Sequence, residues 1–229
     1  MLLAFSGGGT RAASFSYGVL EALRDVTFDV DGKPRRLLDE VDVISSVSGG
    51  SITAAAYGLY GDRTFEILEP AFLKRDVELA LIGQVLNPLN WPALWSSNYS
   101  RSDLTAKYFD EILFKNARFQ DLAGNNSPYL VINATDIATG TRVSFTQYFF
   151  DVISSDLGAY PLSRAATASA AVPGVFSPIT LDNYSGRDPK SAPDWLTRKY
   201  GPDAGAANQQ ATAFKAYLNG SNPFLHLVD

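Results

Sequence analysis

The chain has 229 residues, 46% hydrophobic and 19% charged, a balance that excludes a disordered or collagen-like protein. Lys and Arg total 19 against 24 Asp and Glu, so the net charge of −5 lacks the basic surface typical of a nucleic-acid binder. No cysteine and only one histidine, His226, are present, which excludes thiol catalysis and disulfides and leaves too few ligands for a Cys/His zinc site. We therefore expect no nucleic-acid partner, no metal and no cofactor, and chemistry carried by carboxylates and hydroxyls.

The first residues, Met1 to Phe5, are apolar and lack a basic flank, so we expect a short buried strand and not a signal peptide. A leader removed upstream would leave no trace, so these residues do not give the compartment. No run approaches the ~20 apolar residues that cross a bilayer, and any membrane contact is expected to be peripheral.

The first sixty residues contain one unit twice: an apolar strand, a glycine turn and a helix of small residues. The first unit has a strand at 2–5 and a helix from about residue 12 to 23, and the second has a strand at 41–46 and a helix at 52–60. This order predicts an α/β fold. Residues 29–34 between the two units carry turn residues and predict a surface turn.

The next stretch, residues 65–122, is predicted to be mostly helical, with an amphipathic, core-facing helix at 103–113. Two strands at 129–134 and 142–147 predict a hairpin that turns around Thr139 and Gly140.

The last third begins with an alanine-rich helix at 164–172, which Pro173 ends. Residues 183–205 are rich in Asn, Gly, Asp and Pro and predict a loop insertion. A final strand at 224–229 places Asp229 at its C-terminal end. One domain over 1–229 is the economical interpretation, and because a domain seldom ends on a central strand, we expect the chain to be a fragment that stops after Asp229.

The most informative segment is Val43 to Ser51, in which Ser48 takes the central position of a G-x-S-x-G motif. A serine on a sharp strand-to-helix turn has an exposed hydroxyl, and small neighbours are needed because the backbone is crowded there. Ser46 replaces the first glycine of the motif. The segment is also compatible with a plain connection in which Ser48 caps the following helix.

The second segment, Ser6 to Arg11, has three consecutive glycines, Gly7, Gly8 and Gly9, before a helix. Their unshielded N–H groups, the helix dipole and Arg11 together favour an anion or an oxyanion. The same glycines with Ala12 also fit a dinucleotide fingerprint, with Asp29 or Asp31 at the ribose position. A purely structural glycine turn is a third interpretation.

A Ser-His-Asp triad is not expected, because His226 and Asp229 are three apart on one strand and point to opposite faces. His226 is interpreted as a packing residue. If Ser48 is a nucleophile, the simplest base is a carboxylate, and Asp229 at a strand end is well placed for that role.

Taken together, Ser6 to Arg11, Ser46 to Gly50 and the terminal Leu227 to Asp229 resemble the patatin-like phospholipases, which are Ser-Asp dyad lipid acyl hydrolases. Residues 133–140 resemble the family's Asn-Ala-Thr-Asp stretch, and residues 168–178 resemble its Ala-Ser-x-Ala-x-Pro block. The resemblance implies a three-layer α/β/α fold with a mostly parallel central sheet. The glycines that follow the family's aspartate are absent after Asp229.

Carried over by motif, Gly7, Gly8, Gly9 and Arg11 match the oxyanion-hole motif, Ser48 matches the nucleophile and Asp229 matches the dyad aspartate. The resemblance implies a phospholipase A-type esterase with a covalent acyl-enzyme, acting on a lipid or a membrane surface. It also implies a bacterial and often exported protein. Arg11 is assigned either to a lipid phosphate or to holding the amide loop, with a surface ion pair as the plain alternative.

Residues 79–95 hold two of the three tryptophans and are interpreted either as a lipid-facing lid or as core packing. Three other functions remain open from the residues alone. These are a serine esterase acting on a soluble ester, an inactive lipid-binding protein and a dinucleotide-binding oxidoreductase.

Overall fold

The computed structural model describes residues 1–77, 80, 83, 101–122, 127–173, 176–187, 192–197 and 204–229. The strands are β1 (Leu2–Phe5), β2 (Thr27–Val30), β3 (Lys33–Arg36), β4 (Val43–Val47), β5 (Tyr129–Asp136), β6 (Thr141–Phe145), β7 (Ile179–Asp182) and β8 (Phe224–Val228). The α-helices are α1 (Gly9–Asp25), α2 (Gly49–Tyr60), α3 (Thr64–Leu68), α6 (Arg101–Phe109), α7 (Gln147–Val152), α8 (Leu162–Ala170), α9 (Asp194–Thr197) and α10 (Gly205–Leu218). Short 3₁₀ or π turns lie at Leu37–Glu40, Gly61–Arg63, Glu69–Leu73, Asp110–Phe114 and Phe119–Leu122.

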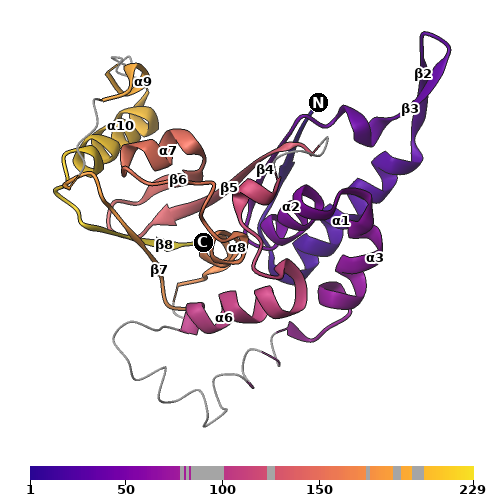
Figure 1. The fold of residues 1–229 in the computed structure, drawn as a ribbon, viewed down its shortest axis with the longest axis horizontal. Coiled ribbons are helices and arrows are strands. Elements are labelled where there is room, and N and C mark those ends of the chain that lie inside the picture. Colours follow the sequence, from indigo (N-terminus) through magenta and orange to yellow (C-terminus); the bar gives the residue numbers. More distant parts are fainter. Residues whose placement is uncertain are drawn as a thin grey trace.

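The main sheet has the strand order β1-β4-β5-β8-β7, and β6 pairs with β5 off this path (Figure 1). β1, β4 and β5 run in parallel, whereas β6 and β8 are antiparallel to β5. β7 is antiparallel to β8 and so shares the direction of the first three strands. The expected α/β/α class, with a mostly parallel central sheet flanked by helices, is confirmed.

Three strands share β5, and this sharing brings two distant chain segments together. Thr135 and Asp136 of β5 pair with both β6 and β8, while Ile132 and Asn133 pair with both β6 and β4. A strand residue has one ladder partner on each side. Since β6 pairs with residues 132–136 along one edge of β5, β4 and β8 lie along the other edge and run toward each other.

The hydrophobic core consists of two clusters of buried side chains. A smaller cluster joins β1 and β4 to α1 and α2, with Phe5, Leu20 and Ile44 among its buried members. A larger cluster contains Ile132, Phe145 and Leu227, and the rings of Phe149 and Phe214 from α7 and α10 pack against each other 5.2 Å apart, centroid to centroid. The larger cluster also includes buried residues of α1, α2 and α3, so it extends across the sheet. In Figure 1, α1, α2 and α3 lie with β1 and β4, whereas α7 and α10 lie at the β6 end.

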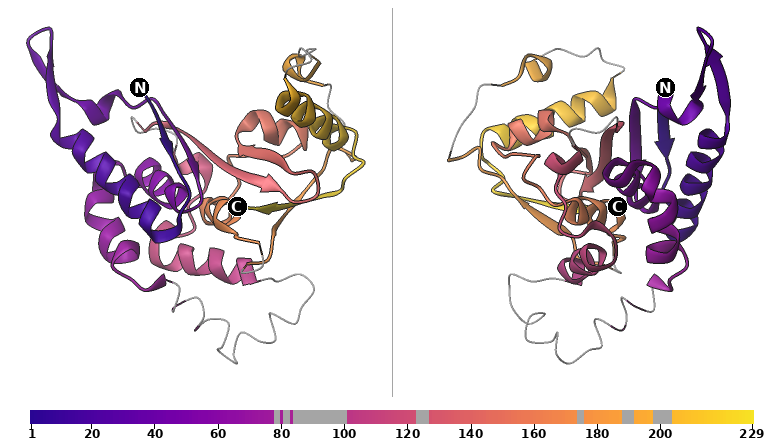
Figure 2. Two further views of the ribbon diagram at one scale, coloured as in Figure 1. Left: turned by 180° about the vertical axis from the view of Figure 1, so that it is seen from behind. Right: turned by 45° about the vertical axis from the view of Figure 1, so that its right-hand side comes forward.

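The predicted surface turn at residues 29–34 is confirmed as the tip of a hairpin, β2–β3, which forms a separate two-stranded sheet. Asp31 and Gly32 occupy the turn with positive φ, and the Asp29 side chain accepts the Gly32 N–H at 2.8 Å. The hairpin projects away from the main sheet in every view (Figures 1 and 2).

The hairpin β5–β6 and the alanine-rich helix α8 match the prediction closely. The strand β1 is present, but its predicted burial is wrong, because it lies at the edge of the sheet and Leu2 is 64% exposed. The strands β2, β3 and β7 and the helices α7 and α10 were not predicted, and the expected loop insertion at 183–205 contains the short α9. Most of the proposed lid at 79–95 lies outside the described residues. No helix in the described ranges is long and apolar enough to cross a membrane.

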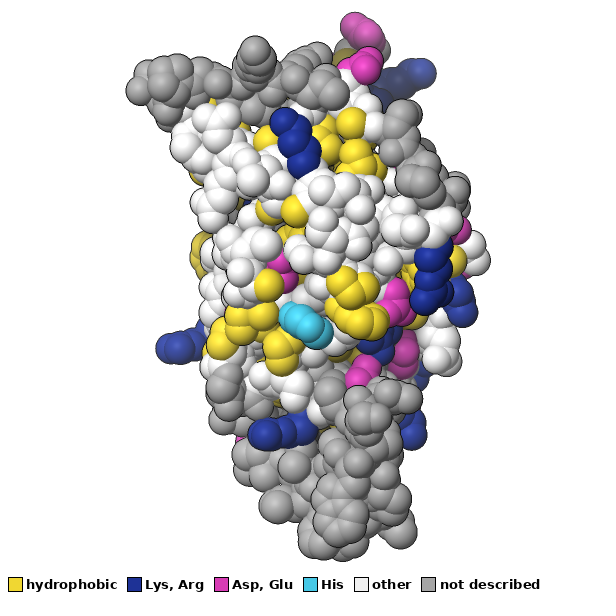
Figure 3. All heavy atoms as spheres, turned by 90° about the vertical axis from the view of Figure 1, so that its left-hand side faces the viewer, with side chains coloured by type: hydrophobic (Ala, Val, Ile, Leu, Met, Phe, Trp, Pro, Cys, Tyr) yellow, Lys and Arg dark blue, Asp and Glu magenta, His cyan; other side chains and the backbone are white. Residues whose placement is uncertain are grey.

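The interpretation of His226 as a packing residue is wrong. Its side chain is on an exposed position of β8, and its Nδ1 lies 3.2 Å from Thr180 Oγ1 of the neighbouring strand β7. Figure 3 shows the histidine, in cyan, at the surface between hydrophobic side chains. It takes this position because alternate residues of β8 face the core, and Leu225 and Leu227 fill those places.

Candidate active site

Ser48 lies between the last residue of β4 and the first residue of α2, with φ 54° and ψ −128°. A residue with a side chain costs about 1–3 kcal/mol in this region of φ and ψ, so the surrounding structure must impose the conformation. Ser48 occupies the N-cap position of α2, yet its side chain makes no capping hydrogen bond. The interpretation of this hydroxyl as a helix cap is therefore wrong.

The two glycines after Ser48 allow α2 to begin directly against the glycine loop. A Cβ on Gly49 would lie 1.9 Å from the carbonyl oxygen of Gly9, and a Cβ on Gly50 would lie 2.7 Å from that of Ser6. Contacts under 3.0 Å with backbone atoms cannot be accommodated without moving one of the loops. The close approach of the two turns therefore requires glycine at both positions.

The glycine loop itself borders Ser48. A Cβ placed on Gly7 would lie 3.2 Å from Ser48 Cβ and 3.8 Å from Ser48 Oγ, so these residues are in van der Waals proximity. Gly8 and Gly9 have φ angles of 137° and 63°, a backbone path that favours glycine. All three glycines are exposed, and Gly8 provides no side-chain cap for α1. The start of α1 thus combines an open backbone with the positive end of a helix dipole.

Arg11 is exposed on the first turn of α1, where its charge adds to the positive potential of the helix start. The ion pairs found among the described residues do not include it. The surface ion-pair interpretation of Arg11 therefore has no partner within the described ranges.

The backbone of Ser48 is tied to α8. Its N–H donates to Ser169 Oγ at 2.8 Å, and the Ser169 hydroxyl donates to the Asn133 carbonyl at 2.6 Å. Asn133 is itself fixed, because its Nδ2 donates to the Ser46 carbonyl at 3.1 Å and its Oδ1 accepts from Ser144. The turn around Ser48 is therefore anchored by side chains from β5 and α8.

Asp229 follows β8 directly and is partly exposed. In the paired register Val47 lies opposite Asn133 and Val228 lies opposite Thr135, on the same edge of β5. These β5 residues are two apart, which corresponds to roughly 7 Å along the strand. β4 and β8 therefore end facing each other, and Ser48 and Asp229 are the residues that follow them in the chain.

A further contact holds Asp229 near α8, since its N–H donates to the Ala171 carbonyl at 3.0 Å. The backbone N–H groups of Ser48 and Asp229 thus both donate to the C-terminal end of α8, one to Ser169 and the other to Ala171. No direct Ser48–Asp229 hydrogen bond is present among the described residues.

A second aspartate near the sheet, Asp136, has a different environment. It is 1% exposed, and its carboxylate accepts from Thr139 Oγ1 at 2.8 Å and from the Tyr217 hydroxyl. Burial raises the pKa of Tyr217, and the hydrogen bond to Asp136 raises it further. The Asp136 oxygens also face the N–H groups of Ala138 and His226, so this carboxylate serves to join β5, β8 and α10.

The dinucleotide interpretation conflicts with the topology. Asp29 and Asp31, the two residues offered for the ribose, lie on the separate β2–β3 hairpin and not on a strand of the main sheet next to the glycine turn. Within the described ranges, no group of three or more His, Asp or Glu side chains is arranged to hold a metal ion.

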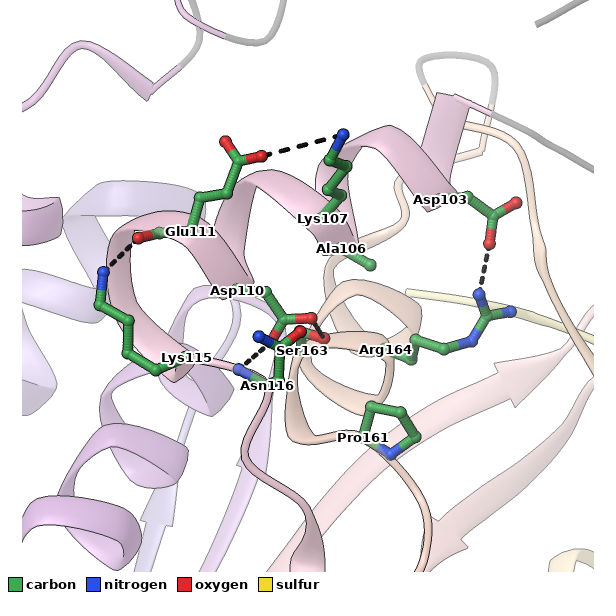
Figure 4. A pocket seen from close by; sticks show the side chains of 10 residues that line it. All are labelled: Asp103, Ala106, Lys107, Asp110, Glu111, Lys115, Asn116, Pro161, Ser163 and Arg164. Carbon is green, nitrogen blue, oxygen red and sulfur yellow. Dashed lines mark hydrogen bonds and ion pairs between the residues drawn. The ribbon is translucent and has the colours of Figure 1, made fainter. Parts of the chain in front are cut away.

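A large cavity lies elsewhere, at the opposite end of α8. It has a volume of about 610 Å³ between α6 with its following turn and the residues around Pro161 (Figure 4). Its lining is charged: Asp103 pairs with Arg164, Lys107 Nζ lies 4.0 Å from Glu111, and Asp110 accepts from Ser163 at 2.9 Å. None of the predicted site residues lines this cavity.

The site thus belongs to an α/β protein with a serine at a strained strand-to-helix turn beside an open glycine loop. A family model of the patatin-like phospholipases matches residues 3–208, and the chain belongs to that family. This is a family of lipid acyl hydrolases that act on lipid substrates. No curated protein matches the chain. The matched range contains Ser48, the three glycines and Arg11, and Asp229 lies beyond it.

Sequence reasoning did not assign roles to Ser169 or Asn133, although both belong to the segments that carry the family resemblance. Ser169 lies 121 residues from the backbone amide it contacts. A polar residue within an alanine-rich buried helix was the available signal, because a buried hydroxyl requires a partner.

Proposed function

We propose that the protein is a lipid acyl hydrolase that cleaves carboxylic esters of phospholipids or related lipids through Ser48 and Asp229. The observation that carries this proposal is the meeting of β4 and β8 on one edge of β5, with the glycine loop in contact with Ser48. Membership in the patatin-like phospholipase family supports the lipid substrate class.

In the proposed reaction the Asp229 carboxylate accepts the proton of Ser48 Oγ, which attacks the carbonyl carbon of the ester. The negative charge on the carbonyl oxygen is stabilised by the N–H groups of Gly7 to Gly9. The bond to the alcohol breaks, and the alcohol leaves with the proton held by Asp229. Water, activated by the same carboxylate, then releases the fatty acid and restores Ser48.

Asp229 is preferred over Asp136 as the base because of their surroundings. The Asp136 carboxylate is buried and surrounded by hydroxyl and N–H donors, which stabilise it as an acceptor within the fold. Asp229 is partly exposed and lies at the strand end that faces Ser48. In this proposal Arg11, exposed at the start of α1, contacts the lipid phosphate.

The first test is intact-mass measurement after treatment with a fluorophosphonate, which reacts with activated serines. We expect a single adduct on the native chain, its loss in Ser48→Ala, and its retention in Ser14→Ala. Ser14 is a suitable control because its exposed hydroxyl bonds the Thr10 carbonyl on α1, outside the proposed chemistry. A Ser48→Ala variant that still forms the adduct would overturn the assignment of the nucleophile.

Turnover tests the rest of the mechanism. With phosphatidylcholine micelles, Ser48→Ala should lose at least about 10³-fold in kcat, because removing a nucleophile leaves only binding and oxyanion stabilisation. Asp229→Asn should also lose activity, since an amide cannot accept the proton. Equal rates on micelles and on a short-chain ester in solution would favour the soluble-ester esterase. Vesicle binding without fatty-acid release would favour the inactive lipid-binding protein.

A further inference from the structure

The backbone amide of Ser48 is held by a hydroxyl from a distant helix. Ser169 on α8 is fully buried, Ser48 is 4% exposed, and their N–H···O distance is 2.8 Å. A buried amide needs a partner, and Ser169 Oγ provides it from outside the turn.

The Ser169 hydroxyl has little freedom of its own. It donates to the Asn133 carbonyl at 2.6 Å, and Ser51 Oγ lies 2.9 Å away on the other side. Ser51 Oγ in turn lies 3.0 Å from Ser46 Oγ, at the end of β4. The acceptor that faces Ser48 is therefore fixed by β5, by α2 and by its own helix.

This arrangement matters because the backbone of Ser48 is strained. At φ 54° and ψ −128°, a residue with a side chain persists only where its surroundings impose that conformation. The direction of the Ser48 N–H depends on this φ, so an acceptor fixed in space selects it. The same contact occupies the N–H of Ser48 and leaves the loop Gly7–Gly9 to provide the open amides.

We propose that Ser169 is a positioning residue for the reaction: by accepting the Ser48 N–H, it keeps Ser48 Oγ aimed at the ester carbon. This inference rests on the proposed function of Ser48 as the nucleophile. Ser169 does not contact the substrate and acts only through the Ser48 backbone. A nucleophile displaced by about 1 Å can lose up to about 10²-fold in rate, which sets the scale of the expected effect.

The test compares Ser169→Ala with a matched control on the same helix, Thr167→Val. Thr167 is 1% exposed, and its Oγ1 is buried without a hydrogen-bond partner in the described structure. Both variants remove a buried hydroxyl from α8, but only one removes the acceptor of Ser48. A third variant, Ser169→Cys, keeps an acceptor at this position, but sulfur is larger than oxygen and accepts more weakly.

Three quantities are measured on the full chain: the exchange rate of the Ser48 amide hydrogen, the rate of fluorophosphonate labelling, and kcat and KM with a micellar ester. We expect Ser169→Ala to speed Ser48 amide exchange and to lower kcat and the labelling rate by about tenfold to 10²-fold, with KM within twofold. Ser169→Cys should fall between, and Thr167→Val should match the native chain in all three.

The outcomes separate this inference from the function on which it rests. Suppose that the native chain is labelled at Ser48, and that both Ser169 variants are labelled at the same rate as the native chain. The positioning role is then overturned, while the proposed function stands. If Thr167→Val loses labelling as strongly as Ser169→Ala, the loss reflects helix packing and the role is overturned as well. A native chain that is never labelled at Ser48 overturns the proposed function, and the positioning role with it.

Discussion

The two ends of α8 border two different kinds of surface. At its C-terminal end, Ser169 and Ala171 hold the backbones of Ser48 and Asp229 among glycines and small hydroxyl residues. At its N-terminal end, Arg164 and Ser163 line the cavity of about 610 Å³ together with charged residues of α6 and the turn that follows it. This cavity is therefore not the place where the predicted site residues meet.

The difference lies in how the polar groups are used. In the cavity, the carboxylates of Asp103, Asp110 and Glu111 face cations or hydroxyl donors of the chain itself. At the other end, the Ser48 hydroxyl caps no helix and the adjoining glycine loop is open to solvent. A strained residue with an uncommitted hydroxyl beside open amides is a better indication of chemistry than cavity size.

The largest effect is expected where the site depends on close approach of backbone. Gly49→Ala would place a methyl group 1.9 Å from the Gly9 carbonyl oxygen, so α2 and the glycine loop must separate. We expect a loss of about 1–3 kcal/mol or more in the free energy of unfolding. We also expect at least about 10²-fold lower turnover, because Ser48 and the amides lose their alignment. Urea unfolding and ester hydrolysis measure the two effects.

The matched control for this change is Gly18→Ala in the middle of α1. A Cβ on Gly18 meets nothing within 4 Å, and its φ is not positive, so alanine should stabilise the helix by about 0.5–1 kcal/mol. Full activity in Gly49→Ala would show that the two turns tolerate separation. The close approach of Ser48 to the glycine loop would then not distinguish this end of α8 from the cavity end.

Local backbone requirements explain why one half of the site was predictable from the sequence. Ser48, Gly49 and the loop Gly7–Gly9 carry their signal in consecutive residues, because sharp turns and positive φ restrict which residues fit. The strand–turn–helix units that present them follow from hydrophobic patterning alone.

The other half of the site depends on pairing between distant segments. The strand end and the family motif predict Asp229 as the partner of Ser48, but the sharing of β5 by β4 and β8, which brings the ends of these two strands together, is contained in no local pattern. The Ser169–Ser48 contact and the Tyr217–Asp136 contact span 121 and 81 residues. α10 was missed because its first half combines Gly205 with the polar residues 208–210 and gives a weak helix signal, which the tertiary packing of Phe214 and Tyr217 overrides.

At the cavity end, a pH-dependent effect of intermediate size is expected from Asp110. Burial raises its pKa above the usual 3.8, with hydrogen bonds from Ser163 and Asn116 opposing the change. Because the folded state then binds the proton more tightly than the unfolded state, the contribution of Asp110 to stability is greatest below pH 3.8. It falls as the pH rises through the raised pKa.

Asp110→Asn removes this titration and serves as its test. The stability of the native chain relative to Asp110→Asn should decrease as the pH rises from about 3 to 7, and the difference should then level off. Urea midpoints measured at several pH values provide the comparison. A difference that grows with pH would mean that hydrogen bonds to the charged carboxylate, and not its burial, dominate at this end of α8.

The smallest effect is expected from the most exposed pair in the cavity. Lys107 and Glu111 are four residues apart across the end of α6, with side chains 65% and 56% exposed and charged atoms 4.0 Å apart. Exposed pairs at this spacing contribute little, and a lysine that precedes the glutamate is in the weaker orientation. Glu111→Gln should therefore change the free energy of unfolding by less than about 0.5 kcal/mol, and less still in high salt.

Ester turnover of Glu111→Gln should stay within twofold of the native rate, because the cavity takes no part in the proposed reaction. A tenfold loss would instead connect the charged end of α8 to the chemistry at its other end.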